Sequence, residues 1–238
     1  HKVNGLPVID HVISNLQKAG CDRIATVVGH MGEQVSEHIN GQSEIFWQHE
    51  RLGTAHAVMQ AQALLDSYSG PVLVIPGDAP ATRPSTIRQL IDAHINSESA
   101  ATVLTMILDD PASYGRIVRD SFGEFTDIVE YKDASDDIRA INEVSTGIIV
   151  FDAAKLSDAL RYIGNDNAQG EYYLTDLAAI AAADGLAVQA LTMDDPLEMI
   201  GINTRAHLAE AAAALQQRIN QEWMLAGVTL IDPATAYI

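Results

Sequence analysis

The stretch PVLVIPGDAP, residues 71–80, constrains the fold more than any other part of the sequence. Residues 72–75 form a short apolar run rich in β-branched side chains, and a Pro-Gly pair follows at once. This pattern predicts a strand covered on both faces, as in a parallel sheet. Gly77 permits a tight turn, so Asp78 is expected at the carboxyl end of the strand, where open α/β sheets bind ligands. Asp78 is therefore either a Mg²⁺ ligand or a cap of the following turn.

Helical and strand patterns alternate along most of the chain. Apolar spacing predicts helices over residues 8–19, 33–39, 55–65, 85–94, 153–163, 174–183 and 204–224. Strands are predicted over residues 23–28, 45–47, 72–75, 101–108, 147–152 and 188–192, with antiparallel pairs within 114–131. The first hundred residues favour a doubly wound parallel sheet, and the antiparallel pattern after them makes the whole sheet mixed. We expect an α/β, Rossmann-like, doubly wound mixed sheet with a C-terminal connecting helix.

Charge and cysteine content exclude several classes of protein. The chain has 238 residues and a formal net charge of −18, which excludes a nucleic acid as partner because phosphate backbones need basic patches. A nucleotide substrate remains open, since a metal ion and a few cations reverse the sign inside one cleft. No apolar run reaches the ~20 residues of a membrane helix. The single Cys21 rules out an internal disulfide and fits a reducing cytoplasm.

Zinc and nucleophile chemistry find no support in the remaining motifs. The 8 histidines show no paired metal-ligand spacing, and neither a G-x-S-x-G motif nor a P-loop occurs. Three acidic pairs fall in expected loops, where we expect them to be solvated: Asp109-Asp110, Asp136-Asp137 and Asp194-Asp195.

The loop at residues 48–54, QHERLGT, joins an expected strand to an expected helix. Gly53 allows close backbone approach, and Thr54 stands at the helix N-terminus, where amides and the helix dipole favour anions. Simple helix capping is the alternative.

Three further segments also have two interpretations. Gly115 lies in SYGRIV, a turn into a strand that is equally explained as structural. Glu130 lies in VEYKDA at a strand end, where an exposed ion pair is the alternative. Asn203 is followed by Thr204, and either residue can be the N-cap of the long helix.

Eight segments, taken in order, resemble the sugar-phosphate nucleotidyltransferases. They are HKVNGLPVIDHV, QHERLGTAHAV, PGDAP, SYGRIV, VEYKDA, STGI, NAQGEYYLTD and GIN. QHERLGTAHAV resembles that family's uracil-binding loop, and PGDAP resembles its metal-binding G-D-x-P. The resemblance is closest to the uridyltransferase domain of the bacterial bifunctional N-acetylglucosamine-1-phosphate uridyltransferase/glucosamine-1-phosphate acetyltransferases. Each motif alone is weak, but the ordered set is specific.

The resemblance implies an enzyme that forms UDP-N-acetylglucosamine and pyrophosphate from UTP and N-acetylglucosamine 1-phosphate, for cell-wall and lipopolysaccharide precursors. It implies Mg²⁺ as cofactor, with Asp78 and Asn203 as the catalytic metal ligands. Uracil and nucleotide contacts are implied at Gln48, Gly53, Thr54 and Gly77. Sugar-phosphate contacts are implied at Gly115, Glu130, Ser145, Thr146, Tyr173 and Thr175. The family commonly has Asn where Ser145 stands, so we expect a poorer sugar contact there.

The resemblance also implies a domain organisation. Residues 1–225 correspond to the nucleotidyltransferase domain, and residues 226–238 resemble the first coil of a left-handed β-helix acetyltransferase domain. A strand and a Gly-rich loop are expected upstream of His1, because the first strand of such a sheet is normally central. The full-length protein is then expected to be a homotrimer, built through the β-helix domain.

Two alternatives are a relative that uses another sugar phosphate or nucleotide, and a non-catalytic nucleotide-sugar-binding scaffold domain. The scaffold is disfavoured because it has no chemical need for both Asp78 and Asn203.

Overall fold

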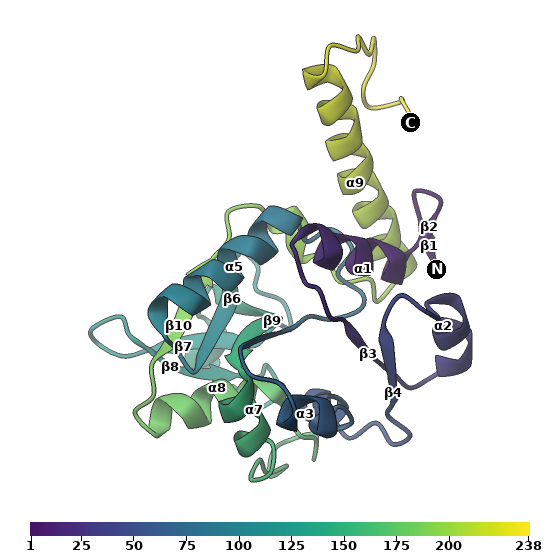
Figure 1. Ribbon diagram of the computed structural model, residues 1–238. Helices are drawn as coiled ribbons and strands as arrows, with labels where there is room; N and C mark the ends of the chain where they lie inside the picture. Colours follow the sequence, from purple (N-terminus) through teal and green to yellow (C-terminus); the bar gives the residue numbers. More distant parts are fainter.

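A six-stranded mixed sheet lies at the centre of the computed structural model, which describes residues 1–238 (Figure 1). The strand order is β10-β6-β9-β7-β8, and β5 also pairs with β9. The strands are β5 (Pro71–Val74), β6 (Ala101–Ile107), β7 (Arg116–Arg119), β8 (Phe125–Val129), β9 (Glu143–Asp152) and β10 (Val188–Thr192). Two smaller pairs lie outside this sheet: β1 (Lys2–Val3) with β2 (Leu6–Pro7), and β3 (Ala25–Val28) with β4 (Glu44–Trp47).

Helices cover both faces of the sheet (Figure 1). On one side lie α1 (Val8–Lys18) and α5 (Pro84–Ser97), and on the other lie α7 (Ala153–Ala159) and α8 (Leu174–Ala183). The remaining helices are α2 (Gly32–His38), α3 (Thr54–Met59), α4 (Gln62–Asp66), α6 (Asp136–Arg139), the 3-10 helix η1 (Pro196–Met199) and α9 (Arg205–Leu225). None of them combines the length and apolar character that crossing a membrane requires.

Successive side chains of the central strands pack alternately into two hydrophobic clusters, one on each face of the sheet. In β6, Val103 packs with the cluster under α7 and α8, whereas Leu104 packs with the cluster under α5. In β9, Ile149 and Val150 divide in the same way. Successive side chains of a strand point to opposite faces, so each strand supplies both halves of the core. The expected α/β mixed-sheet fold is confirmed.

The expectation that the strand at residues 72–75 belongs to a parallel pair is wrong. Its partner β9 is antiparallel to β5 as well as to β6 and β7, and only β10 and β6 pair in parallel inside the sheet. All four residues of β5 are half-exposed, whereas the first six of β6 are buried. The side chains of β5 do pack on both faces, as the apolar run predicted, with Val72 and Val74 against one cluster and Leu73 against the other. Its remaining exposure reflects its single strand partner, whereas β6 has two.

Two predicted helices also differ from the structure. The stretch at residues 55–65 forms two short helices, α3 and α4, which are separated at Gln60 and Ala61. The helix predicted over residues 204–224 corresponds to α9, but large apolar side chains do not form its buried face. Instead its buried residues are Ala211, Ala214, Gln216 and Asn220, and Trp223 is 47% exposed. Helix α9 projects from the body of the molecule, so little protein covers its far end (Figure 1).

Candidate functional site

Asp78 and Asn203 lie beside the same glycine. Asp78 follows β5, and Asn203 lies between η1 and α9. A Cβ atom added to Gly201 would lie 3.5 Å from Oδ2 of Asp78 and 3.7 Å from Nδ2 of Asn203. The backbone N–H of Ile202 donates a hydrogen bond to the carbonyl oxygen of Asp78 at 3.1 Å. The fold therefore brings these two side chains to one point from distant parts of the chain.

Neither side chain serves as a helix or turn cap. Thr204 caps α9, because its Oγ1 accepts a hydrogen bond from the backbone N–H of His207 at 3.1 Å. The turn after β5 closes through a backbone hydrogen bond from Ala79 to Pro76 at 3.4 Å. The side chains of Asp78 and Asn203 take no part in these contacts, so both remain available to a ligand.

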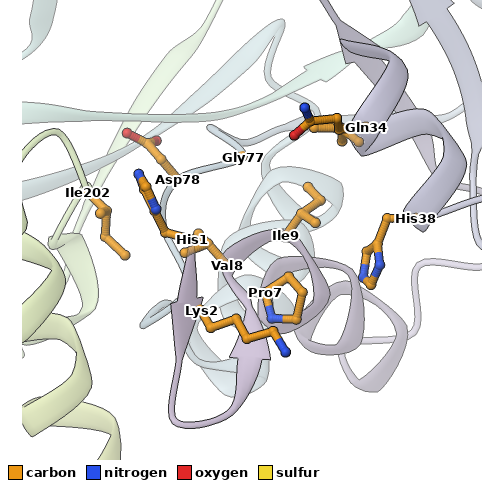
Figure 2. Close-up of a pocket in the computed structure, with 11 residues that line it drawn as sticks. His1, Lys2, Pro7, Val8, Ile9, Gln34, His38, Gly77, Asp78 and Ile202 are labelled. Atoms are coloured by element: carbon orange, nitrogen blue, oxygen red, sulfur yellow. The ribbon is translucent and has the colours of Figure 1, made fainter. Parts of the chain in front are cut away.

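A cavity of about 500 Å³ opens next to Asp78 (Figure 2). Gly77 and Asp78 line one side, and the N-terminal segment lines the other. The remaining lining residues are His1, Lys2, Pro7, Val8, Ile9, Gln34, Val35, His38 and Ile202. Lys2 adds a cationic side chain to the lining of the cavity that Asp78 also lines, a combination that suits an anionic ligand held with a cation.

The loop at residues 48–54 is fastened to the segment before α8. Nε2 of Gln48 donates to the carbonyl oxygen of Gly53 at 3.0 Å. Gly53 has a φ of 113°, and a Cβ atom there would lie 2.4 Å from the carbonyl oxygen of Tyr172, so only glycine fits. Oγ1 of Thr54 accepts a hydrogen bond from the N–H of Leu174 at 2.8 Å. The side chain of Thr54 thus holds the loop in place, and Gly53 rather than Thr54 is the N-cap of α3.

A second group of predicted residues gathers around Glu130. Oε1 of Glu130 accepts a hydrogen bond from the hydroxyl of Thr175 at 3.0 Å. A Cβ atom added to Gly115 would lie 3.4 Å from the same oxygen. The carbonyl oxygen of Gly115 accepts from the N–H of Ser145 at 2.8 Å. Three strands and the first turn of α8 therefore meet at these four residues.

Ser145 and Thr146 shape a bulge in β9. Gly147 has a φ of 75°, and the register between β6 and β9 shifts at this point. Oγ of Ser145 accepts from the N–H of Gly147 at 3.2 Å, and Oγ1 of Thr146 donates to the carbonyl oxygen of Leu104 at 2.8 Å. Both hydroxyls already have partners in the protein, and Ser145 is 5% exposed.

Tyr173 lies at the edge of this group. It is buried, and its hydroxyl accepts a hydrogen bond from Nε2 of Gln169 at 2.8 Å. Lys132 in turn donates to Oε1 of Gln169. The Lys132 ammonium is therefore paired with a neutral amide, so the ion pair considered for the EYK segment does not form.

The carboxyl groups near Glu130 have raised pKa values. Burial is the main cause for Glu130, and the hydrogen bond from Thr175 partly offsets it. Burial and the charges of Asp127, Glu130 and Asp133 raise the pKa of Asp176 to about 6. This end of the site therefore favours neutral hydroxyl and amide groups over further negative charge.

Some neighbours of the site did not stand out in the sequence. Burial, followed by the charge of Asp78, raises the pKa of the Tyr114 hydroxyl. Arg116 is buried and donates to the carbonyl oxygens of Ala112 at 3.0 Å and Arg139 at 3.2 Å. The motif SYGRIV contains both Tyr114 and Arg116, and it was the signal available for finding them.

The donor atoms of Asp78 and Asn203 fit a magnesium ion. Mg²⁺ takes oxygen ligands in an octahedron and usually keeps only one or two protein carboxylates beside water and phosphate oxygens. The Asp78 carboxylate, which lines the cavity, and the side-chain amide of Asn203, which lies beside the same glycine, can supply such oxygen donors. No group of three or more His, Cys, Asp or Glu residues could hold a metal ion instead.

The sequence profile of the family described as nucleotidyl transferase matches residues 1–223. The chain is 47% identical over 240 residues to a bifunctional protein GlmU from Geobacter metallireducens and 45% identical over 238 residues to one from Geobacillus. All of this chain is covered in both matches, together with 50% and 52% of the relatives, so the chain spans about half the length of the curated relatives it matches.

The fold also has a counterpart among solved structures. A Bacillus anthracis structure, described as a candidate glucose-1-phosphate thymidylyltransferase in complex with a sucrose, superposes with a TM-score of 0.71. The two are 18% identical, and the match covers 98% of this chain and 88% of the other. At this identity the likeness supports the shared fold alone.

Proposed function

The chain belongs to the nucleotidyl transferase family, and from this membership we propose that it forms UDP-N-acetylglucosamine and pyrophosphate from UTP and N-acetylglucosamine 1-phosphate. The observation that carries the proposal is the convergence of Asp78 and Asn203 beside Gly201, next to a cavity. The relatives named GlmU, at 45–47% identity over the full chain, support this assignment.

Uridylyl transfer needs no protein nucleophile, because the sugar phosphate is itself an anionic nucleophile. The task of the protein is to align this phosphate with the α-phosphorus of UTP and to neutralise the developing charge. A Mg²⁺ ion held by Asp78 and Asn203 would supply Lewis-acid stabilisation of the phosphate oxygens. Lys2, which lines the same cavity as Asp78, adds positive charge to the lining.

We assign the uracil of UTP and the amino sugar to the two groups of residues described above. The loop of Gln48, Gly53 and Thr54 holds the uracil, with Gly77 under the nucleotide. The group of Gly115, Glu130, Ser145, Thr146, Tyr173 and Thr175 holds the amino sugar. A buried Glu130 suits this role, since its carboxylate can accept a hydrogen bond from a sugar hydroxyl or amide while Thr175 holds it in place.

The test measures pyrophosphate release by the full-length protein that carries this chain, with UTP, N-acetylglucosamine 1-phosphate and Mg²⁺. We expect release with these substrates and a loss of about 100-fold or more in turnover for Asp78→Asn, because a neutral amide would hold less firmly the Mg²⁺ ion that stabilises charge at the transition state. Circular dichroism controls for folding. Equal rates with TTP and glucose 1-phosphate would instead indicate another specificity, and binding of UTP without turnover would indicate a scaffold.

We also propose that the full-length protein is bifunctional and cytoplasmic. Residues 226–238 would begin a left-handed β-helix acetyltransferase domain, through which three copies associate. The relatives support this proposal, because both are described as bifunctional proteins about twice as long as this chain. Sedimentation equilibrium of the full-length protein tests the trimer, and a monomer would contradict it.

A further inference from the structure

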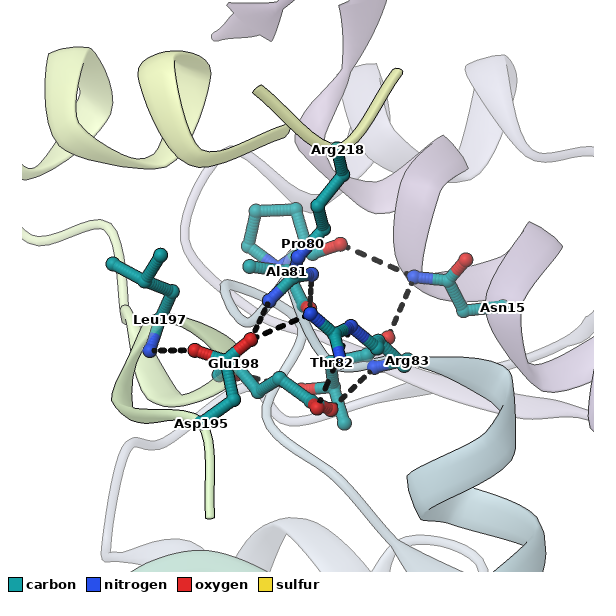
Figure 3. Close-up of polar contacts among 9 residues, drawn as sticks. All are labelled: Asn15, Pro80, Ala81, Thr82, Arg83, Asp195, Leu197, Glu198 and Arg218. Carbon is teal, nitrogen blue, oxygen red and sulfur yellow. Dashed lines mark hydrogen bonds and ion pairs between the residues drawn. The ribbon is translucent and has the colours of Figure 1, made fainter. Parts of the chain in front are cut away.

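The loop after Asp78 is joined to the loop before Asn203 by four charged side chains (Figure 3). These are Arg83, Asp195, Glu198 and Arg218, hereafter the charged network. We propose that the charged network positions Asp78 against Asn203 and thereby sets the affinity of the site for a divalent cation. The inference rests on the proposed function, because it takes these two residues as the metal ligands.

Asp195 is the centre of the charged network. Its Oδ2 accepts a hydrogen bond from Nη2 of Arg83 at 2.6 Å and another from Nη2 of Arg218 at 3.2 Å. Its Oδ1 accepts from the backbone N–H of Leu197 at 3.0 Å. Asp195 therefore connects the N-terminal end of α5, the start of η1 and the middle of α9.

Glu198 fastens the same loop from inside the protein. Its side chain is 4% exposed, and its Oε2 accepts from the backbone N–H of Arg83 at 2.8 Å. Its backbone carbonyl accepts from the hydroxyl of Thr82 at 3.0 Å. A carboxylate this buried is costly to separate from its partners, so the contact holds the two loops at a fixed distance.

Two helices hold the loop from the other side. The amide of Asn15, on α1, donates to the carbonyl oxygens of Pro80 at 3.1 Å and Thr82 at 2.9 Å. Nη1 of Arg218, on α9, donates to the carbonyl oxygen of Ala81. Because residues 79–82 are buried as well, the loop is held by α1, η1 and α9 at once.

The charged network lies close to the proposed ligands along the chain. Asp78 comes shortly before Pro80, and Asn203 comes shortly after Glu198. Mg²⁺ demands near-ideal octahedral geometry with oxygen distances of about 2.0–2.1 Å, so a small shift of either loop weakens its coordination. The backbone hydrogen bond from Ile202 to Asp78 joins the two loops directly. The charged network holds the same two loops together at a second place.

The variant Asp195→Asn in the full-length protein tests the inference. It preserves size and the acceptor for Leu197, and it removes the charge that holds both guanidinium groups. The readouts are Mn²⁺ binding in the presence of UTP, by electron paramagnetic resonance, and the Mg²⁺ concentration for half-maximal pyrophosphate release. We expect the dissociation constant for Mn²⁺ and the Mg²⁺ concentration for half-maximal release each to rise about 10-fold, as for other residues that orient metal ligands. The KM for the sugar phosphate at saturating Mg²⁺ should stay unchanged, and Asp195→Glu should restore part of the affinity.

Asp66→Asn is the matched control. It breaks an ion pair at 2.9 Å between Asp66, at the end of α4, and Arg161, in the turn after α7, outside the residues assigned to the site. We expect it to lower the melting temperature and to leave Mn²⁺ binding unchanged.

Three results would contradict these assignments in different ways. If Asp195→Asn is destabilised like Asp66→Asn but binds Mn²⁺ like the wild type, the charged network is only structural and the inference is overturned. If Asp195→Asn does not fold, Arg83→Met, at a side chain 45% exposed, replaces it, and wild-type Mn²⁺ binding in that variant overturns the inference equally. A wild-type protein that neither binds Mn²⁺ with UTP nor releases pyrophosphate would overturn the proposed function itself.

Discussion

At the scale of single residues, Asp176 shows how the site accommodates its excess of carboxylates. It lies in the first turn of α8, half-buried, and the neighbouring charges of Asp127, Glu130 and Asp133 add to the effect of burial. A carboxyl group in such surroundings takes up a proton more readily than an exposed one, so the negative charge around Glu130 decreases as the pH falls toward 6.

We predict that Asp176→Asn changes the pH dependence of stability. The folded-state pKa of about 6 lies above the usual value of 3.8, so the wild-type protein loses unfolding free energy as pH rises from about 4 to 6. The variant has no such titration and should gain about 1 kcal/mol relative to the wild type between pH 4 and pH 7.5, after allowance for solvent screening. Urea unfolding at both pH values measures this difference. The exposed Asp109→Asn is the control, and an equal gain there would refute the explanation.

A second prediction concerns position 145. Ser145→Asn should lower the KM for the sugar phosphate by roughly 2- to 10-fold, the effect of one added hydrogen bond of about 0.5–1.5 kcal/mol. Steady-state kinetics at saturating UTP gives this value, and the KM for UTP is the internal control. An unchanged KM for the sugar phosphate would mean that position 145 does not contact the sugar, as its burial and its bond to Gly147 also allow.

At the scale of elements, β5 is the strand whose surroundings differ most from expectation. Every residue of β5 is half-exposed, and in β3, which is a member of a separate pair, only Val28 is buried. Each of these strands has one neighbour, so each has backbone groups without a strand partner. Leaving such groups unpaired in a buried place costs roughly 1–3 kcal/mol each.

We therefore predict that a strand upstream of His1 pairs with β5 in the full-length protein. Hydrogen exchange should show strong protection of the β5 amides that do not face β9 in the full-length protein, and weak protection in the 238-residue chain alone. The amides of β6, which has strand partners on both sides, should be protected in both and serve as the reference. Equal exchange of β5 in the two proteins would contradict the prediction.

Local sequence patterns were sufficient to locate most helices and strands, but they did not show which strands pair with one another. The apolar spacing located α1, α5, α8 and nearly all of α9, because amphipathic periodicity is a local property. The antiparallel pairing of β9 with its neighbours depends on packing between distant segments, which no single stretch encodes.

The same limit explains the error at Asp195. Its side chain is 25% exposed and paired with Arg83 and Arg218, so it is only partly solvated. The local pattern could not predict this, because the two partners lie 112 and 23 residues away in the sequence. By contrast, Asp78 and Asn203 could be proposed as a pair from their motifs, and the fold brings them together.

At the scale of the whole molecule, α9 sets the shape. It projects from the body, and the C-terminal residues turn back beside its far end (Figure 1). The amide of Asn220, which is 1% exposed, donates to the carbonyl oxygens of Pro233 at 2.7 Å and Ala236 at 2.9 Å. Gln216 donates to the carbonyl oxygen of the same amide at 3.0 Å. Hydrogen bonds therefore join the C-terminal residues to the far end of α9, where few apolar side chains pack.

These contacts join the returning tail to α9. We predict that helix α9 and the returning tail rotate with the body as one particle. The fluorescence anisotropy of Trp223 should then decay with a single, slow correlation time. A Trp47→Phe background leaves Trp223 as the only one of the 2 tryptophans. Adding Asn220→Ala should introduce a fast nanosecond component, because the tail loses both of its amide contacts. A fast component already present with Asn220 intact would mean that α9 is flexible. If the fast component is absent, α9 is rigid, and a segment attached to its end keeps a fixed orientation relative to the body.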